Sequence, residues 1–578
     1  MADTNAKENC TPNNNNKLRF LHVKLPAKER FFYWTIWLTS ITFPFYTAWK
    51  VSSQQQQDVL KRDLEPSSWF NSPWLLMKDT NDSEWDYWRS NVVHLTILFI
   101  TNTVLSLVTR SFIHRDNQHL VILGFTFILQ GIVLSPQGLL IVILLISIAY
   151  LVITQMKQVV PVWIICIITL FAIHDDSLKL RMFEMANIRN DNENLVRLIV
   201  MMAVIRIISF SGVYNENTRD ISKNTDSHEN ENNENLKDDN QRKKQIRNSR
   251  SDENDRVEDK NDEKPKSRDR NEKSGSRNIN DKSSDNETTM NNNIGFHHLL
   301  MYSLYIPVCY NGPLISFETF YKDFYTKPKD FPIKTVLRDT LLTIFNIITL
   351  EVFFHLVYAN TLCMYYNILE KMSVPEAISM FWIHLHIFNI KYFIFYRFSG
   401  IFAKLEGVEP PGPPKCIASL YTFVDMWRYF DKGLNTFLLQ NIYIPLGGSV
   451  KGFLRRTIAS FLCFVFVGFW HGADKSLMIW AVTNWLGIVV ESLGTSLTRT
   501  EMYQKTVWIN HPSLHRRLCA LGGAFSVFTL IYTNMIFLVG FDPATILLWR
   551  VLSVWYWPPL CLFVFYCGNN CSIDTSYT

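Results

Sequence analysis

The stretch FLCFVFVGFWHGADKSLMIWAVTNWLGIVVE, residues 461–491, is long and mainly apolar, which is typical of membrane-spanning helices. It contains a single histidine, His471. A helix that spans a bilayer needs roughly 20 mainly apolar residues. Ionisable side chains inside such a run usually face a protein interior or a water-filled cavity, and they are functional candidates by default. The ordinary alternative for His471 is a hydrogen bond to a backbone carbonyl, but its Trp-His-Gly context favours catalysis.

A second stretch, DMWRYFDKGLNTFLLQNIYIPLGGS at residues 425–449, contains too many Asp, Arg, Lys and Gly residues to cross lipid as a simple helix. Polar or non-helical backbone at membrane depth is tolerated only where protein or a cavity satisfies it. We therefore expect Asp431 and His471 to share one internal chamber.

The composition is uneven along the chain. Hydrophobic residues make up 48%, and the mean hydropathy is close to zero, which would suit a soluble protein if the residues were evenly mixed. Residues 215–293, however, contain no Phe, Trp or Tyr, and they hold 17 basic and 20 acidic residues among 79. Such a segment cannot bury enough apolar surface to offset its ordering entropy, so it is predicted to be a disordered charged insert.

Outside the insert, the apolar runs predict an all-α, polytopic membrane helical bundle of about ten spans plus re-entrant segments, with a tunnel through its core. The candidate runs lie near residues 31–49, 92–109, 119–134, 137–156, 159–174, 195–213, 336–359, 375–397, 457–473, 476–494, 517–541 and 544–567. The expected organisation is a cytosolic N-terminal tail (1–30), a front transmembrane half (31–214), the insert (215–293), a catalytic transmembrane core (294–567) and a C-terminal tail (568–578).

The first residues lack the short apolar core of a cleaved signal peptide. Lys24, Lys28 and Arg30 precede the first apolar run, and basic residues favour the cytosolic side of a membrane. The N-terminus is therefore expected in the cytosol, with the first span as an uncleaved anchor.

An imidazole and a carboxylate in one chamber suit acyl transfer. A neutral histidine can take a proton from a nucleophile at cellular pH, and a positioned base contributes about a hundred to ten-thousandfold in rate. The carboxylate of Asp431 would hold an amine nucleophile, whereas an Asn there would suit a hydroxyl better. For an acyl thioester, the acyl chain prefers lipid while the CoA phosphates prefer basic side chains.

Basic residues bracket the Asp431 segment and could meet those phosphates through charge-assisted hydrogen bonds; they are Arg428, Lys451, Arg455 and Arg456. The alternatives are membrane topology alone for the last three and an i, i+3 pair with Asp431 for Arg428. Five other histidines in or near apolar runs are expected to have structural roles: His297, His298, His355, His384 and His386.

Ten cysteines are scattered, with no CxxC pair or zinc spacing, and most are expected to be small buried hydrophobes. Cys416 differs because it ends the proline-rich stretch EPPGPPKC, residues 409–416, just before the Asp431 segment. A bend at that place can present a thiolate ligand.

Residues 426–449, the Trp-His-Gly of 470–472, the stretch WAVTNWLGIVVE at 480–491 and YSLYIPVCYNGPLISFETF at 302–320 resemble the membrane-bound O-acyltransferase superfamily, in particular its Hedgehog acyltransferase branch. The resemblance covers most of residues 294–495, and the front half only by its helix pattern. The charged insert departs from the family's compact pattern.

The resemblance implies that His471 is the signature histidine and that Asp431 stands where protein N-acyltransferases carry Asp. It implies that Trp427, Arg428 and Trp470 lie near the acyl-CoA site, and that Cys416 is the axial ligand of a haem iron. The implied reaction transfers palmitate from palmitoyl-CoA to the N-terminal cysteine amine of a secreted signalling protein of the Hedgehog or EGF type, in the endoplasmic reticulum or Golgi membrane. Lipid is then a further partner, and no nucleic acid is expected.

Two alternatives stay open. The first is an O-acyltransferase of the same superfamily that acts on a protein serine or a lipid hydroxyl, which Asp431 disfavours. The second is a transporter or scaffold with a polar interior and no chemistry, which the Trp-His-Gly context disfavours.

Overall fold

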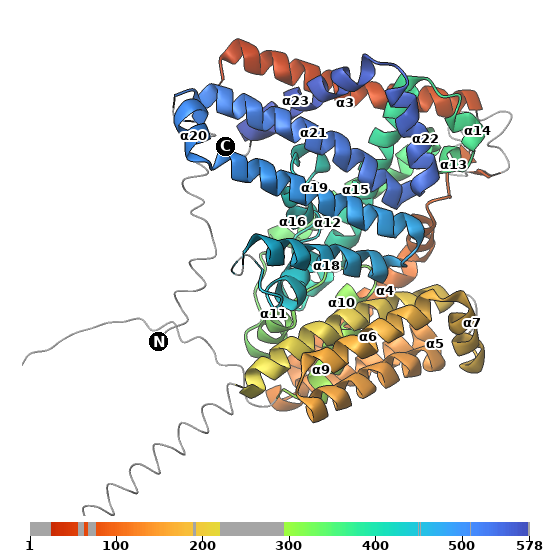
Figure 1. The fold of residues 1–578 in the computed structure, drawn as a ribbon. Helices are drawn as coiled ribbons and strands as arrows, with labels where there is room; N and C mark the ends of the chain where they lie inside the picture. Colours follow the sequence, from red (N-terminus) through yellow and green to blue (C-terminus); the bar gives the residue numbers. More distant parts are fainter. Residues whose placement is uncertain are drawn as a thin grey trace, which may run out of the picture. The chain divides into compact units, whose positions relative to one another are not determined.

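The computed structural model describes residues 25–55, 63–66, 77–188, 192–219, 294–448, 450, 452–508 and 510–575. This described part is almost entirely helical (Figure 1). It divides into two compact units, of which the first comprises Met1–Ser211 and Phe296–Thr578 and the second Gly212–Gly295. Residues 1–24 of the expected N-terminal tail and 220–293 of the expected insert lie outside the described residues.

The front half consists of long helices and one short pair of strands. Strands β1 (Glu65–Pro66) and β2 (Met77–Lys78) pair antiparallel, with Glu65 opposite Lys78. The helices are α3 (Ala27–Gln55), α4 (Ser83–Phe112), α5 (Arg115–Met156), α6 (Val159–His174), α7 (Asp176–Met185) and a further helix at Asn192–Arg219.

The back half mixes long helices with short helical pieces. Its longer helices are α12 (Ile333–Leu356), α15 (Val374–Leu405), α18 (Phe453–His471), α19 (Lys475–Thr498), α21 (Pro512–Val539), α22 (Phe541–Leu552) and α23 (Trp557–Thr575). The short pieces are α9 (Phe296–Leu304), α10 (Ile306–Cys309), α11 (Phe317–Tyr321), η2 (Lys322–Thr326), α13 (Ala359–Cys363), α14 (Tyr366–Leu369), η3 (Ile417–Ser419), α16 (Phe423–Tyr429), α17 (Lys432–Leu438), η4 (Leu439–Tyr443), α20 (Glu501–Tyr503) and η5 (Gln504–Trp508).

The described residues contain seven helices that are long and apolar enough to cross a membrane, or up to nine if each of two sharply bent pairs counts as one span. The bent pairs are α6 with α7 and α22 with α23. The expectation was about ten: α3 and α12, which hold two of the expected runs, are not among these helices, and two further expected runs lie in the single helix α5.

Helix α5 joins two runs that we expected as separate helices, residues 119–134 and 137–156. Ser135 interrupts it with φ 66° and ψ 157°, directly before Pro136. Proline has no backbone N–H to donate, and it disfavours helical geometry in the residue before it. The break therefore lies where the proline is, within one bent helix.

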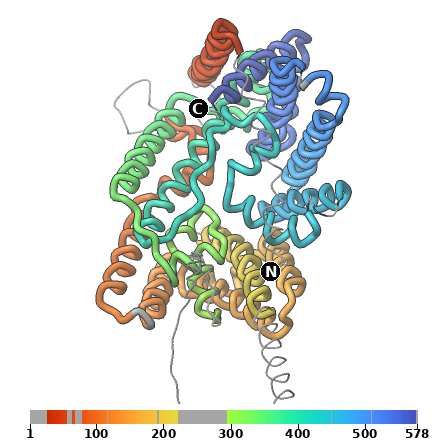
Figure 2. The backbone as a smooth tube through the Cα atoms, turned by 90° about the vertical axis from the view of Figure 1, so that its left-hand side faces the viewer, coloured from red at the N-terminus to blue at the C-terminus, as the bar shows by residue number. Residues whose placement is uncertain are grey.

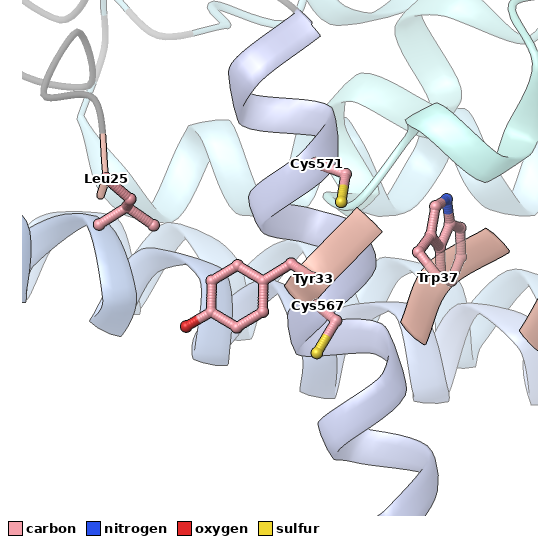
Figure 3. Packing of buried hydrophobic residues seen from close by; sticks show 5 residues of the cluster. All are labelled: Leu25, Tyr33, Trp37, Cys567 and Cys571. Atoms are coloured by element: carbon pink, nitrogen blue, oxygen red, sulfur yellow. The ribbon is translucent and has the colours of Figure 1, made fainter. Parts of the chain in front are cut away.

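The expected C-terminal tail, residues 568–578, is instead helical as far as Thr575, because its residues are packed against α3. Cys567 and Cys571 of α23 are buried beside Tyr33 and Trp37 of α3 (Figure 3). Figure 2 shows the two helices, α3 in red and α23 in dark blue, lying side by side. Apolar burial of this kind stabilises a terminal segment that would otherwise fray.

Helix α15 is the centre of the back half, since it packs against α3, α12, α21 and α22. Helices α18, α19 and α21 follow one another in sequence and in space (Figure 1). Close approach of α18 to α19 depends on Gly468, where an added Cβ would lie 3.2 Å from the Ala481 Cβ and from the Leu477 carbonyl oxygen. Small residues at such contacts let membrane helices approach closely.

The described part of the interrupted stretch, residues 425–448, contains most of α16 and the short elements α17 and η4. The first residue of α16 is bonded to α19: the Phe423 backbone N–H donates to the Glu491 carboxylate at 2.6 Å. At Gly433 the backbone of α17 runs directly against residue 314: a Cβ there would lie 2.1 Å from the Leu314 carbonyl oxygen. Only glycine fits this contact.

Replacing Gly433 by alanine should therefore destabilise the protein by at least the cost of overpacking, about 1–3 kcal/mol. Gly494, in α19, is a matched control, because an added Cβ there would meet nothing within 4 Å. Thermal unfolding of the detergent-purified protein should show a lower Tm for Gly433→Ala and an unchanged or slightly higher Tm for Gly494→Ala. Equal Tm values for the two variants would contradict the close contact.

Candidate active site

One cavity of about 530 Å³ lies among the back-half helices and the helix at Asn192–Arg219. Its volume is within the range of small-molecule sites, about 300–1,000 Å³. The predicted residues that line it are Trp427, Arg428, Asp431, Trp470 and His471. The structure therefore brings together five of the six predicted site residues, and only Cys416 is not among the lining residues.

The cavity follows one face of α18. Arg456, Ser460, Phe464, Val467 and His471 all line it, at spacings of three or four residues that place them along one side of a helix. With a rise of 1.5 Å per residue, Arg456 and His471 are about 22 Å apart along the helix axis. The cavity thus connects a guanidinium at one end of α18 with an imidazole at the other.

His471 lies at the C-terminal end of α18, and its ring is held by aromatic neighbours. The ring centroid is 4.6 Å from that of Trp470, 5.0 Å from Phe537 and 6.4 Å from Trp480. Within the part of the chain that the structure describes, no hydrogen bond to the imidazole is found. The residue is half-buried. Its nitrogens are therefore available to a molecule in the cavity.

Other histidines near the membrane segments are satisfied by backbone carbonyls, as expected for structural residues. The Nδ1 atoms of His355, His384 and His386 lie 2.7, 2.9 and 2.8 Å from the carbonyl oxygen four residues earlier in their own helices. His298 is buried against the rings of Tyr321 and Tyr325, and the His297 ring contacts that of His298 at a tilted angle. His471 differs from all of these because it faces the cavity.

Asp431 has a structural role as well as a place in the cavity wall. One of its oxygens caps α17 by accepting the Leu434 N–H at 2.9 Å, and the other accepts the Tyr396 hydroxyl at 2.5 Å. An ionised carboxylate has about four acceptor positions, so it can still accept a hydrogen bond from a bound donor. No hydrogen bond joins Asp431 to His471 in the described chain, and the cavity lies between their helices.

Arg428 does not form the pair with Asp431 that was the alternative to a role in phosphate binding. It lies 3.9 Å from Asp425, one turn earlier in α16, and its side chain is 54% exposed. An exposed pair at that distance contributes little to stability. The guanidinium is therefore available to a ligand at the cavity wall.

The two tryptophans make different contacts. The indole N–H of Trp470 donates to the Met201 carbonyl oxygen at 3.1 Å. The indole nitrogen of Trp427 is buried and has no hydrogen-bond partner among the described residues. A buried donor without a partner is costly; the Trp427 ring itself lines the cavity.

Sequence reasoning missed a second polar group in the cavity wall. The Glu84 carboxylate lines the cavity and accepts from Asn311 at 3.1 Å and from Lys391 at 2.9 Å. Lys391 is buried and also pairs with Asp82 at 2.9 Å. These residues stand in ordinary helix-start and mid-helix contexts, where no motif distinguishes them; Asn534, on α21, also lines the cavity and was missed for the same reason.

Cys416 is exposed and directly precedes η3. Its neighbour Ile417 lines the cavity, but Cys416 does not. Among the described residues there is also no group of three or more His, Cys, Asp or Glu side chains that could hold a metal ion. A haem ligand needs an enclosing apolar slot, and these observations do not support one at Cys416.

Comparison with known proteins places these residues in a family context. Residues 143–539 match the membrane-bound O-acyltransferase family. The mouse protein-cysteine N-palmitoyltransferase HHAT (Mus musculus) is 33% identical over 288 residues, which is 48% of this chain and 57% of the relative. The fruit-fly protein-cysteine N-palmitoyltransferase Rasp (Drosophila melanogaster) is 29% identical over 214 residues, 36% of this chain and 41% of the relative.

A yeast relative carries a more general name. The membrane-bound O-acyltransferase gup1 of Schizosaccharomyces pombe is 28% identical over 251 residues, 42% of this chain and 40% of the relative. This chain thus spans about half the length of the curated relatives that it matches. The family match covers well over half of the chain and includes the whole cavity segment of α16 to α19, so this multi-pass membrane protein belongs to the membrane-bound O-acyltransferase family.

Proposed function

We propose that this protein transfers palmitate from palmitoyl-CoA to the amine of an N-terminal cysteine on a secreted signalling protein. The observation that carries the proposal is that His471 and Asp431, 40 positions apart, line one cavity in which the imidazole has no hydrogen-bond partner from the described protein. The mouse and fruit-fly relatives named as protein-cysteine N-palmitoyltransferases support the same reaction.

The shape and charge of the cavity suit a thioester of CoA. Arg456 and Arg428 line it, and guanidinium groups bind phosphate through paired, charge-assisted hydrogen bonds. A donor whose phosphates meet Arg456 reaches His471 only through an extended arm, because about 22 Å separates the two residues along α18. The pantetheine arm of CoA has that form, and the apolar walls at Phe464 and Val467 suit the acyl chain.

In the proposed reaction the amine nitrogen attacks the thioester carbonyl carbon, an amide bond forms, and the carbon–sulfur bond to CoA breaks. His471 takes the proton that the amine loses and returns it to the departing sulfur of CoA. Asp431 accepts a hydrogen bond from the amine and holds it near the carbonyl.

A second candidate is transfer to a hydroxyl, which the similarity to the yeast membrane-bound O-acyltransferase gup1 favours. A hydroxyl nucleophile carries no positive charge, so it gains little from a carboxylate in the cavity. Because Asp431 and Glu84 both line the cavity, we favour the amine. A transporter or scaffold would not need an unpartnered histidine at this depth.

We further propose that the protein works in the endoplasmic reticulum or Golgi membrane, where a secreted substrate and cytosolic palmitoyl-CoA can approach from opposite faces. Haem binding at Cys416 rests on the family resemblance alone, so no step of the reaction is assigned to it.

The identity of the nucleophile is tested with purified protein, labelled palmitoyl-CoA and three peptides that begin with Cys, acetyl-Cys or Ser. We expect label on the free-Cys peptide, because only this peptide presents an α-amine together with the thiol. Labelling of acetyl-Cys as readily as free Cys would overturn N-acylation, and preferential labelling of Ser at its hydroxyl would favour the second candidate.

The roles of the two central residues are tested by His471→Ala and Asp431→Asn. Loss of the base should lower kcat by about a hundred to ten-thousandfold. Asparagine is as good a helix N-cap as aspartate, so Asp431→Asn keeps the cap of α17 while it removes the charge, and it should lose transfer at an unchanged Tm.

Asp474 provides the matched control, because it caps α19 by accepting the Leu477 N–H at 3.0 Å and does not line the cavity. Asp474→Asn should keep normal turnover. Normal turnover in His471→Ala would mean that this histidine is not the base.

The family resemblance predicts a Soret absorption band in the purified protein that disappears in Cys416→Ala. A spectrum without the band, or a band that Cys416→Ala leaves unchanged, removes Cys416 from the set of functional residues.

A further inference from the structure

The backbone carbonyl of Trp470 lies in the last turn of α18, where helix carbonyls have no N–H donor four residues later. The end of this helix is a tight turn: the Ala473 N–H donates to the Gly468 carbonyl oxygen at 3.1 Å, and the Gly472 N–H donates to that of Phe469 at 3.2 Å. In the described chain, neither these nor any other backbone N–H donates to Trp470.

A histidine from the front half forms a hydrogen bond with the Trp470 carbonyl oxygen. His174 is the last residue of α6, at the 91° bend between α6 and α7, and its Nε2 atom lies 3.1 Å from the Trp470 carbonyl oxygen. The contact joins two residues that are 296 positions apart in the chain. It therefore ties the corner of a front-half helix pair to the residue next to His471.

The direction of this hydrogen bond follows from the second partner of His174. The Arg197 guanidinium lies 3.1 Å from Nδ1, and a guanidinium can only donate. Nδ1 therefore accepts, the neutral ring carries its proton on Nε2, and Nε2–H donates to the Trp470 carbonyl. Arg197 selects the tautomer that the contact needs.

The helix that contains Arg197 makes a second hydrogen bond with Trp470. Met201, one turn after Arg197 in the helix at Asn192–Arg219, accepts the Trp470 indole N–H at 3.1 Å. Both polar groups of Trp470 that could move, its carbonyl and its indole N–H, are thus bonded to front-half residues. Trp470 is fixed from outside its own helix.

This anchoring matters for His471 because the imidazole has no hydrogen bond of its own in the described structure. Its direction depends on the backbone of residues 470–473 and on ring packing against Phe537. That backbone is unusual, with φ 150° at Gly472 and φ 60° at Ala473. A left-handed alanine is sparsely populated and persists only where its surroundings hold it.

We propose that His174, oriented by Arg197, is a positioning residue that holds the Trp470–Ala473 turn and thereby aims the His471 imidazole into the cavity. The proposal rests on the proposed function for its effect on turnover. His174 does not line the cavity, so it acts through Trp470 and does not touch substrate.

The test compares His174→Ala with His174→Gln in the full-length, detergent-purified protein, with palmitoyl-CoA and a Cys-first peptide. Small misplacement of a catalytic group costs up to about a hundredfold in rate. We expect His174→Ala to lower kcat about ten- to a hundredfold with an unchanged KM for palmitoyl-CoA. The glutamine amide can donate from near the Nε2 position, so His174→Gln should recover most of the rate.

His386→Ala is the matched control, because this membrane histidine also bonds a backbone carbonyl, at Trp382 of its own helix, and lies outside the cavity lining. It should leave kcat unchanged. Wild-type kcat in His174→Ala, equal losses in the alanine and glutamine variants, or a raised KM in place of a lowered kcat would each overturn the proposal.

A readout without acyl transfer separates this proposal from the proposed function. Diethyl pyrocarbonate modifies neutral imidazoles, and mass spectrometry of the substrate-free protein gives the rate at His471 alone. We expect His174→Ala to change that rate several-fold and His174→Gln to restore it. If the wild type transfers no palmitate, the proposed function fails while this rate still decides the role of His174; equal rates in all three proteins would overturn it.

Discussion

The structure depends on one constraint: a polar group at membrane depth must find its partner inside the protein. Most polar side chains along these helices obey it. Lys78 pairs with Glu351 at 2.7 Å, and the Trp85 indole N–H donates to the other oxygen of Glu351 at 2.9 Å. The His471 imidazole differs from these groups, because His471 lines a cavity and the ring has no hydrogen-bond partner in the described chain. The imidazole is therefore available to a molecule in the cavity.

That cavity is lined by elements that lie far apart along the chain. Asp431 comes from the short helices that follow α15, His471 from the end of α18, and Glu84 from the start of α4. The contact of His174 with Trp470 adds the corner of α6. His174 lies in the front half, in the part of it that the family model also matches, so the proposed positioning role joins both halves of the protein.

Much of the site could be predicted because its residues stand out locally. His471 interrupts an apolar run, and Asp431 lies in a stretch too polar for a simple span. Each can therefore be identified as a candidate from the sequence without knowledge of the fold. Glu84, Lys391 and His174 could not be found in this way, since their importance comes only from neighbours hundreds of positions away. The alternative pairing of Arg428 with Asp431 is not formed, because α16 ends before Asp431; Arg428 lies instead near Asp425 of the same helix. In the fold, the helical class was predictable from hydropathy, whereas the helical C-terminus depends on packing against α3 that no local pattern reveals.

An experimental structure of the protein with a non-hydrolysable palmitoyl-CoA analogue and a Cys-first peptide bound would show directly whether the two substrates meet at His471 and Asp431. We expect the carbonyl of the analogue and the peptide amine to meet in the cavity between these residues, with the CoA phosphates toward Arg456. Density that placed the acyl carbonyl outside this cavity, or the peptide amine away from both residues, would contradict it.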